Sequence, residues 1–274
     1  MLFLYLQIMK NNSIGIFDSG IGGLTIAHAI KEQMPNESII YFGDTKHLPY
    51  GEKSEEAIQD FSKNISDFLI EQNCKAIVIA CNSAASVAYK EVSEIAKNIP
   101  VFNVIEPVVQ YIDNTCNTST IGVIGTKATI QSNIYADKIK HKNKSQKVCS
   151  LATPLLAPMI EEGFINEEIS KTVIHNYLNN PTLKNIECLI LACTHYPLIQ
   201  NEIKQFYNNK INVIDSAKIV AESIFNQLKK MDLLNNSNRT EYHFYVSNYT
   251  SSFEQSARFF FQEEIKLEEI NLHP

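Results

Sequence analysis

Short apolar runs recur along the chain, and most end abruptly in small or polar residues. They cover residues 14–17, 38–43, 76–80, 101–104, 121–125, 147–152, 188–192, 211–214 and 241–246. Runs this short, rich in Ile and Val, are typical of strands buried on both faces of a parallel sheet. We therefore predict a strand at each of these positions.

Amphipathic or Ala-rich stretches lie between many of these runs, and we predict helices there. They cover Leu24 to Gln33, Ser54 to about Asn73, the segment after Cys81 to about Lys97, the segment after Ser216 to about Met231, and a tail helix containing Phe253 and Phe259 to Phe261. Residues 154–158, with a proline at each end, predict a stiff crossover, and residues 235–239 a loop. Alternating strands and helices predict the α/β class.

The second half of the chain repeats the pattern of the first. The run beginning at Ile121 resembles the one beginning at Ile14, since each is an apolar strand closed by a small polar residue. The spacing from Gly15 to Cys81 nearly equals that from Gly122 to Cys193. The two halves therefore look like an internal duplication.

The repeated feature is a strand that ends in cysteine. Cys81 follows the strand 76–80 and precedes an Ala-rich helix, while Cys193 follows the strand 188–192 and precedes Pro197, a residue suited to a helix start. Open α/β sheets bind ligands at such strand ends, where the helix dipole favours a thiolate or a carboxylate. We predict that the two thiols face each other across one site.

Polar residues at other strand ends are further candidates. Asp18 and Ser19 open the glycine-rich turn 20–23, which lacks the spacing of the known phosphate-binding loops. Asp18 is a candidate helix cap as well as a site residue. Thr126 and Thr129 lie one turn apart at the corresponding place in the second half.

Two more segments have both a structural and a functional interpretation. Pro49-Tyr50-Gly51 forms a fixed turn carrying an aromatic hydroxyl, which suits either a site loop or a surface anchor. Glu161 and Glu162 follow the 154–158 crossover, where carboxylates near a helix start are usually partners of its dipole in solvent.

The bulk composition of the 274 residues is that of a soluble globular protein, and the net charge of −6 disfavours nucleic acid as a partner. The apolar opening, residues 1–9, is too short to span a membrane, and Met9 is an alternative start to Met1. With no CxxC spacing and no secretory signal, we expect reduced cysteines in a cytoplasmic protein. Four are expected to be small core hydrophobes, namely Cys74, Cys116, Cys149 and Cys188.

Two opposed thiols can remove a proton on one face of a carbon and return one on the other. At the α-carbon of an amino acid this is racemisation. Asp18 is placed to assist Cys81, and His195 to assist Cys193. A disulfide redox pair lacks its local motif, and a zinc site would need more well-spaced ligands.

Five segments in order carry a family resemblance. They are Ile-Phe-Asp18-Ser19-Gly20-Ile-Gly22-Gly23, Pro49-Tyr50-Gly51, Ala-Cys81-Asn82-Ser83-Ala, Gly125-Thr126 and Ala-Cys193-Thr194-His195-Tyr196-Pro197. With them the chain, from about Ser13 through the Phe-rich tail, resembles the bacterial glutamate racemases, a family of the cofactor-independent aspartate/glutamate racemase superfamily. Ser83 and Ala192 stand where that family often has Thr and Gly.

The resemblance implies interconversion of L- and D-glutamate without cofactor or metal, with D-glutamate entering peptidoglycan precursors and so supporting cell shape. It implies that Cys81 takes the proton from the D-isomer and Cys193 from the L-isomer, assisted by Asp18, His195 and Glu161, the choice of Glu161 over Glu162 being the less secure because the family's loop varies there. Residues implied to contact substrate or shape the site are Asp18, Ser19, Pro49, Tyr50, Gly51, Asn82, Ser83, Thr126, Thr194 and His195.

We expect two similar, pseudo-symmetric α/β domains with mainly parallel central sheets and the active site in the cleft between them. The first comprises residues 1–103 and 216–274, the second residues 104–215, and the protein is expected to be a homodimer. The alternatives are a racemase of the superfamily acting on aspartate or a hydantoin, a non-catalytic glutamate-binding regulatory protein, and a redox protein.

Overall fold

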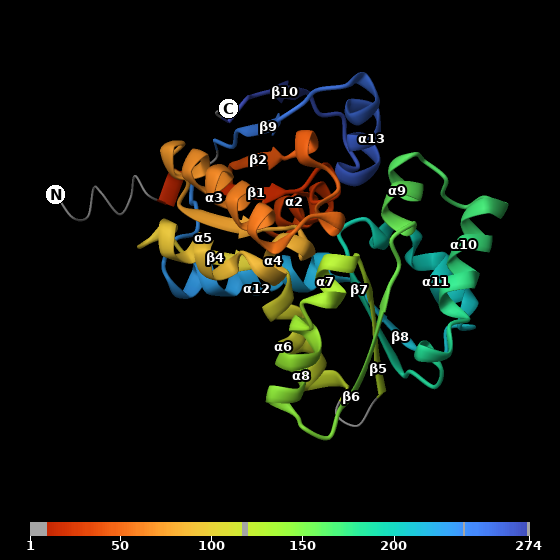
Figure 1. The fold of residues 1–274 in the computed structure, drawn as a ribbon. Coiled ribbons are helices and arrows are strands. Elements are labelled where there is room, and N and C mark those ends of the chain that lie inside the picture. Colours follow the sequence, from red (N-terminus) through yellow and green to blue (C-terminus); the bar gives the residue numbers. More distant parts are fainter. Residues whose placement is uncertain (1–9, 117–119, 238, 273–274) are drawn as a thin grey trace.

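The computed structural model describes residues 10–116, 120–237 and 239–272 and contains two parallel sheets (Figure 1). The larger sheet has the strand order β10-β9-β2-β1-β3-β4, and the smaller has β6-β5-β7-β8. The strands are β1 Ile14–Asp18, β2 Ile39–Gly43, β3 Ala76–Ile79, β4 Val101–Asn103, β5 Thr120–Gly125, β6 Lys147–Ala152, β7 Cys188–Ala192, β8 Asn212–Ile214, β9 Tyr242–Val246 and β10 Leu267–Glu269. Every neighbouring pair is parallel, which confirms the predicted α/β class.

The two sheets share one strand order. In the larger sheet β2-β1-β3-β4 runs second, first, third, fourth, and β6-β5-β7-β8 runs the same way in the smaller. Such a sheet reverses its winding beside its first strand, and ligands bind at the carboxyl ends of the strands there. Those ends carry Asp18 and Cys81 in one sheet and Thr126 and Cys193 in the other.

Helices cover both sheets (Figure 1). They are α2 Leu24–Gln33, α3 Glu55–Glu71, α4 Asn82–Val87, α5 Tyr89–Ala96, α6 Ile105–Thr115, α7 Lys127–Gln131, α8 Ile134–Lys142, α9 Leu156–Glu161, α10 Glu168–Leu178, α11 Gln200–Phe206, α12 Ser216–Lys230 and α13 Ser251–Phe261. Short 3₁₀ helices cover Thr45–His47, Tyr50–Glu52, Pro181–Leu183 and Tyr196–Ile199. As predicted, Ser54 caps α3, with its hydroxyl accepting a hydrogen bond from the Ala57 N–H.

Two local predictions were wrong. The single helix expected after Cys81 is broken at Ala88 into α4 and α5, because Ala88 leaves helical geometry with φ −116° and ψ 1°. The crossover at 154–158 becomes helical from Leu156, so Glu161 ends α9 instead of lying near a helix start. The dipole of α9 therefore gives no reason for a carboxylate at this place.

The C-terminal tail completes the larger sheet. Strand β9 pairs with β2, and α13 packs on α2 with Phe260 and Phe261 buried, as expected for an apolar tail returning to the first half. Phe259 points outward and is 65% exposed, contrary to that expectation, because it lies on the outer face of α13.

The cysteines outside the strand ends differ from expectation in one respect. Cys116 and Cys188 are buried as predicted, but they form a disulfide, so the prediction of reduced thiols is wrong for this pair. The fold brings the end of α6 beside the start of β7 across 72 residues of sequence, which no local spacing reveals. Cys74 is a free buried thiol, whereas Cys149 on β6 is free and only half-buried.

No helix within the described residues is long and apolar enough to cross a membrane. The two sheets draw their strands from the segments expected for the two domains, but the boundaries 1–103 with 216–274, and 104–215, stay a prediction. Both candidate starts, Met1 and Met9, lie outside the described residues.

Candidate active site

A small cleft of about 40 Å³ lies where the switch points of the two sheets meet. It receives residues from both halves of the chain and contains both strand-end cysteines. Its lining is Ser19, Leu48, Pro49, Tyr50, Gly51, Cys81, Asn82, Ser83, Thr126, Ala157, Pro158, Glu161, Cys193, Thr194 and His195. The residues implied to react with or contact the ligand are all in this lining except Asp18, which lies behind it; the other candidates, Thr129 and Glu162, are not part of it.

Cys81 is the residue at which β3 gives way to α4, and its side chain is 5% exposed. The Sγ lies 3.6 Å from the Ser19 Oγ, to which the thiol donates. Burial, reinforced by the charge of Asp18, raises the pKa of the Cys81 thiol to about 12. In the free protein this thiol is therefore protonated at neutral pH.

Alkylation of Cys81 by iodoacetamide should therefore keep accelerating with pH. Because only the thiolate reacts, we expect the rate to rise by about tenfold per pH unit up to at least pH 10. The measurement is the modified fraction of the Cys81 peptide by mass spectrometry. Limited access through the narrow cleft lowers every rate but leaves the slope unchanged, so a plateau below pH 9 would contradict the raised pKa.

Asp18 is fully buried beside the cleft. Its carboxylate accepts hydrogen bonds from the Gly20 N–H at 3.0 Å and the Thr194 hydroxyl at 3.4 Å. Residue Gly23 holds the N-cap position of α2, so Asp18 stands outside the helix. Burial raises the pKa of Asp18, although the charge of His195 opposes the shift. A carboxylate of raised pKa is a better proton acceptor for a nearby thiol.

Cys193, His195 and Glu161 form a chain of contacts on the other side. The Cys193 Sγ lies 3.6 Å from the His195 Nδ1, and the His195 Nε2 lies 2.7 Å from the Glu161 Oε1. Burial by itself lowers the pKa of His195, but Cys193 and Glu161 outweigh it and raise that pKa well above its ordinary value. Glu162 is exposed, so the geometry selects Glu161 as the carboxylate beside the histidine.

The Pro49-Tyr50-Gly51 turn forms a wall of the cleft. Tyr50 is 1% exposed, which excludes the surface-anchor interpretation. Gly51 packs against the second half so closely that a Cβ there would lie 2.7 Å from the Thr126 Cβ. Outside the cleft, Glu52 and Lys127 form an ion pair at 3.0 Å across the same junction.

Hydroxyl groups from both halves meet beside this wall. Ser83 Oγ and Thr126 Oγ1 are 2.8 Å apart, and Thr126 donates to the Thr129 hydroxyl at 3.1 Å. Thr126 is also the N-cap residue of α7. Hydroxyls at helix starts are suitable donors for a carboxylate ligand.

Sequence reasoning missed Tyr135. The Tyr135 hydroxyl donates to the Asn82 Oδ1 at 2.7 Å, and both side chains are buried. Since the carbonyl oxygen of Asn82 is thus occupied, its amide group is fixed with Nδ2 free to donate. That Nδ2 is buried and has no partner among the described residues. Tyr135 lies on α8 of the other half, and nothing in its local sequence indicates the contact.

Replacing Tyr135 by Phe should weaken the binding of an acceptor ligand without unfolding the protein. Loss of the hydroxyl frees the Asn82 amide to rotate. We therefore expect the KM for a carboxylate-bearing substrate to rise by about five- to tenfold, which corresponds to the loss of about one hydrogen bond. Steady-state kinetics of Tyr135→Phe against the wild type measure this. An unchanged KM would mean that Tyr135 only packs.

The described residues contain no group of three or more His, Cys, Asp or Glu side chains arranged to hold a metal ion. The cleft itself offers two thiols from different sheets, an acid near one, and a histidine–carboxylate pair near the other. Hydroxyl and amide donors lie between them. This arrangement is suited to moving a proton to and from a carbon atom of a carboxylate-bearing ligand.

The known proteins that this chain resembles are racemases, enzymes that move a proton to and from a carbon atom. The model of the Asp/Glu/Hydantoin racemase family matches residues 24–224. A glutamate racemase of Neisseria meningitidis is 41% identical over 243 residues, covering 88% of this chain and 90% of the relative. The crystal structure of a Francisella tularensis glutamate racemase with D-glutamate superposes with a TM-score of 0.91 at 43% identity, covering 96% of this chain and 98% of that one. A Bacillus anthracis glutamate racemase has the same TM-score and coverage at 35% identity.

Proposed function

The chain belongs to the Asp/Glu/Hydantoin racemase family, and on that premise we propose that it interconverts L- and D-glutamate with two cysteines and no cofactor. The observation that supports this most strongly is the pair of cysteine-ended strands, one from each sheet, which line a single cleft. The product D-glutamate would supply peptidoglycan synthesis, as the resemblance to bacterial glutamate racemases implies.

In the direction from D to L, the Cys81 thiolate removes the Cα proton and the Cys193 thiol donates its proton to the opposite face. In the reverse direction the two exchange roles. Asp18 accepts the Cys81 proton to form the thiolate, and its raised pKa suits it for this. His195, held by Glu161, serves Cys193 in the same way.

The donors around the thiols would bind the substrate. The hydroxyls of Ser19, Ser83, Thr126 and Thr194 and the amide of Asn82 suit its two carboxylates, and the turn at Pro49 to Gly51 forms a wall. No cofactor delocalises the carbanion in this proposal, so fixed dipoles in a small cleft must stabilise it.

The direct test is proton NMR of L-glutamate in deuterium oxide with the purified protein, without added metal or pyridoxal phosphate, together with an assay for D-glutamate. We expect the α-proton signal to disappear as D-glutamate forms. Exchange on aspartate but not glutamate would favour another racemase of the superfamily. Binding of glutamate without exchange would favour a regulatory protein, and thiol titration before and after oxidation would reveal a redox protein.

The proposal includes a homodimer that acts in the cytoplasm, where glutamate racemases supply D-glutamate for peptidoglycan precursors. Light scattering coupled to size-exclusion chromatography measures the assembly, and a mass of about one chain would contradict the dimer.

A further inference from the structure

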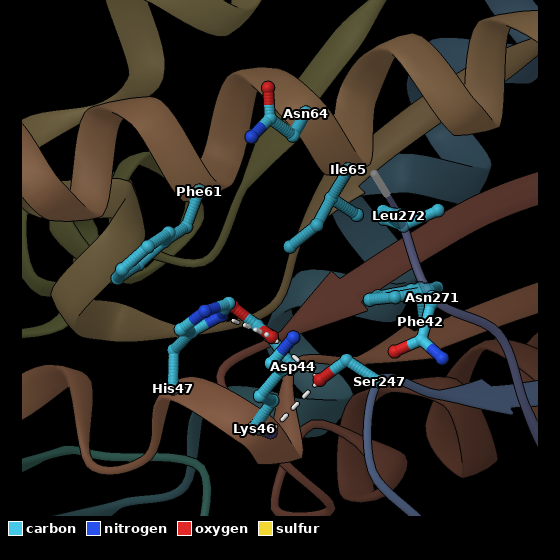
Figure 2. Close-up of a pocket in the computed structure, with 10 residues that line it drawn as sticks. All are labelled: Phe42, Asp44, Lys46, His47, Phe61, Asn64, Ile65, Ser247, Asn271 and Leu272. Carbon is cyan, nitrogen blue, oxygen red and sulfur yellow. Dashed lines mark hydrogen bonds and ion pairs between the residues drawn. The ribbon is translucent and has the colours of Figure 1, made fainter. Parts of the chain in front are cut away.

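Asp44 lies behind the wall of the cleft, between it and a second cavity. This second cavity has a volume of about 120 Å³ and is lined by Asp44 together with His47, Ser247 and residues of α3 (Figure 2). Asp44 is 3% exposed and is absent from the lining of the cleft, whereas Tyr50 lines it. Asp44 therefore has no access to a ligand in the cleft except through another residue.

The carboxylate of Asp44 receives three side-chain donors. The Tyr50 hydroxyl donates to Oδ2 at 2.6 Å, and the Ser247 hydroxyl donates to Oδ1 at 2.7 Å. The His47 Nδ1 lies 2.9 Å from both oxygens. Hydrogen bonds to a charged acceptor are about twice as strong as neutral ones, so a buried carboxylate holds these partners firmly.

Distant segments keep this carboxylate in place. Ser247 follows β9, and its hydroxyl also accepts from the Lys46 N–H at 2.9 Å, as the dashed lines in Figure 2 show. The Asp44 N–H donates to the Asp18 carbonyl at 3.0 Å. Asp44, which holds the Tyr50 hydroxyl, is thus hydrogen-bonded both to Ser247 in the C-terminal tail and to Asp18 at the end of β1.

We propose that Asp44 is a positioning residue for the reaction, which holds the Tyr50 hydroxyl and thereby fixes the Pro49–Gly51 wall of the cleft, with Ser247 orienting the carboxylate. The proposal rests on the proposed function. The Tyr50 pKa is consistent with it, since burial and then the Asp44 charge raise that pKa well above its ordinary value.

The test is the kinetics of Asp44→Asn, Tyr50→Phe and the double variant. An amide keeps the shape of the side chain but loses the charge and one acceptor oxygen. We expect KM for glutamate to rise by about tenfold or more in Asp44→Asn, with a smaller change in kcat. If Asp44 acts through the Tyr50 hydroxyl, the double variant should have no higher KM than the worse single variant. Effects that multiply, or an unchanged KM in Asp44→Asn, would overturn the proposal.

Two further variants keep the test decisive. Ser247→Ala leaves the charge of Asp44 in place and removes the hydrogen bond from the Ser247 hydroxyl. It should raise the KM for glutamate several-fold, and it can be measured even if Asp44→Asn fails to fold. An unchanged KM would contradict the role of Ser247. Asn64→Ala is the matched control, because Asn64 is exposed on the other side of the same cavity, and its KM should equal that of the wild type.

The wild-type enzyme separates this proposal from the proposed function. If wild-type protein does not racemise glutamate, the function fails, and the effect of Asp44→Asn is then measured as the change in the Kd of D-glutamate by calorimetry. A rise in Kd by about tenfold would still support positioning by Asp44, and an unchanged Kd would overturn it.

Discussion

Replacing either Cys81 or Cys193 by serine is expected to abolish racemisation. A serine hydroxyl has nearly the volume of the thiol but is far less acidic, so one face of the α-carbon loses its proton carrier. General acid–base groups contribute about 10²- to 10⁴-fold each, and we expect kcat to fall by at least about 10³-fold in each variant. The measurement is D-glutamate formation from L-glutamate, and L from D, with matched protein concentrations.

Solvent exchange distinguishes the two thiols. In deuterium oxide, Cys193→Ser retains Cys81 and should wash out the α-proton of D-glutamate only, whereas Cys81→Ser should act on L-glutamate only. Cys149→Ser is the control, because this free thiol lies on β6 outside the cleft and its loss should leave kcat unchanged. Substantial turnover in either active-site variant would end the two-thiol mechanism.

Several of the predicted residues that the structure brings to the cleft share one property, which is their position at a strand end. Cys81, Cys193 and Thr126 each follow an apolar run, and in parallel sheets of one winding order such ends converge. The place of Asp18 follows from the same rule. The duplicated pattern was thus enough to predict the α/β class and the pair of thiols.

The residues that were missed act through contacts made over long distances in sequence. Tyr135 reaches Asn82 from the other half, and Ser247 reaches Asp44 across 203 positions. Neither contact leaves a periodicity or a spacing. The disulfide of Cys116 with Cys188 is hidden for the same reason, since its two elements meet only in the folded chain.

The sequence reasoning named Glu161 but could not decide firmly between it and Glu162, for a local reason. Adjacent residues on a helix point about 100° apart, so only the orientation of α9 decides which one meets His195. The prolines at 154 and 158 suggested a stiff crossover, whereas helix α9 begins inside that segment and sets the direction of Glu161 at its end.

Replacing Gly22 by alanine is expected to disable the Cys193 side of the site. A Cβ at Gly22 would lie 2.3 Å from the Cε1 and 2.5 Å from the Nδ1 of His195, distances at which the ring must move. The ring is confined, because its Nε2 is held by Glu161 and it packs nearly perpendicular to the Phe260 ring, with the ring centroids 5.2 Å apart. Displacing it breaks the contact with the Cys193 thiol, so we expect kcat to fall by about 100-fold.

A neighbouring glycine provides the control for this steric argument. At Gly20 an added Cβ would meet only the flexible end of the Leu48 side chain, at 3.0 Å, so Gly20→Ala should lose far less activity. In the double variant Gly22→Ala/His195→Ala the added methyl group has no ring to displace, although it would still lie 2.7 Å from the Thr194 Oγ1, so this variant should be only slightly slower than His195→Ala alone. Near-normal kcat in Gly22→Ala with an intact fold would show that His195 is not needed where the structure places it. The assisting role would then pass to another group near Cys193.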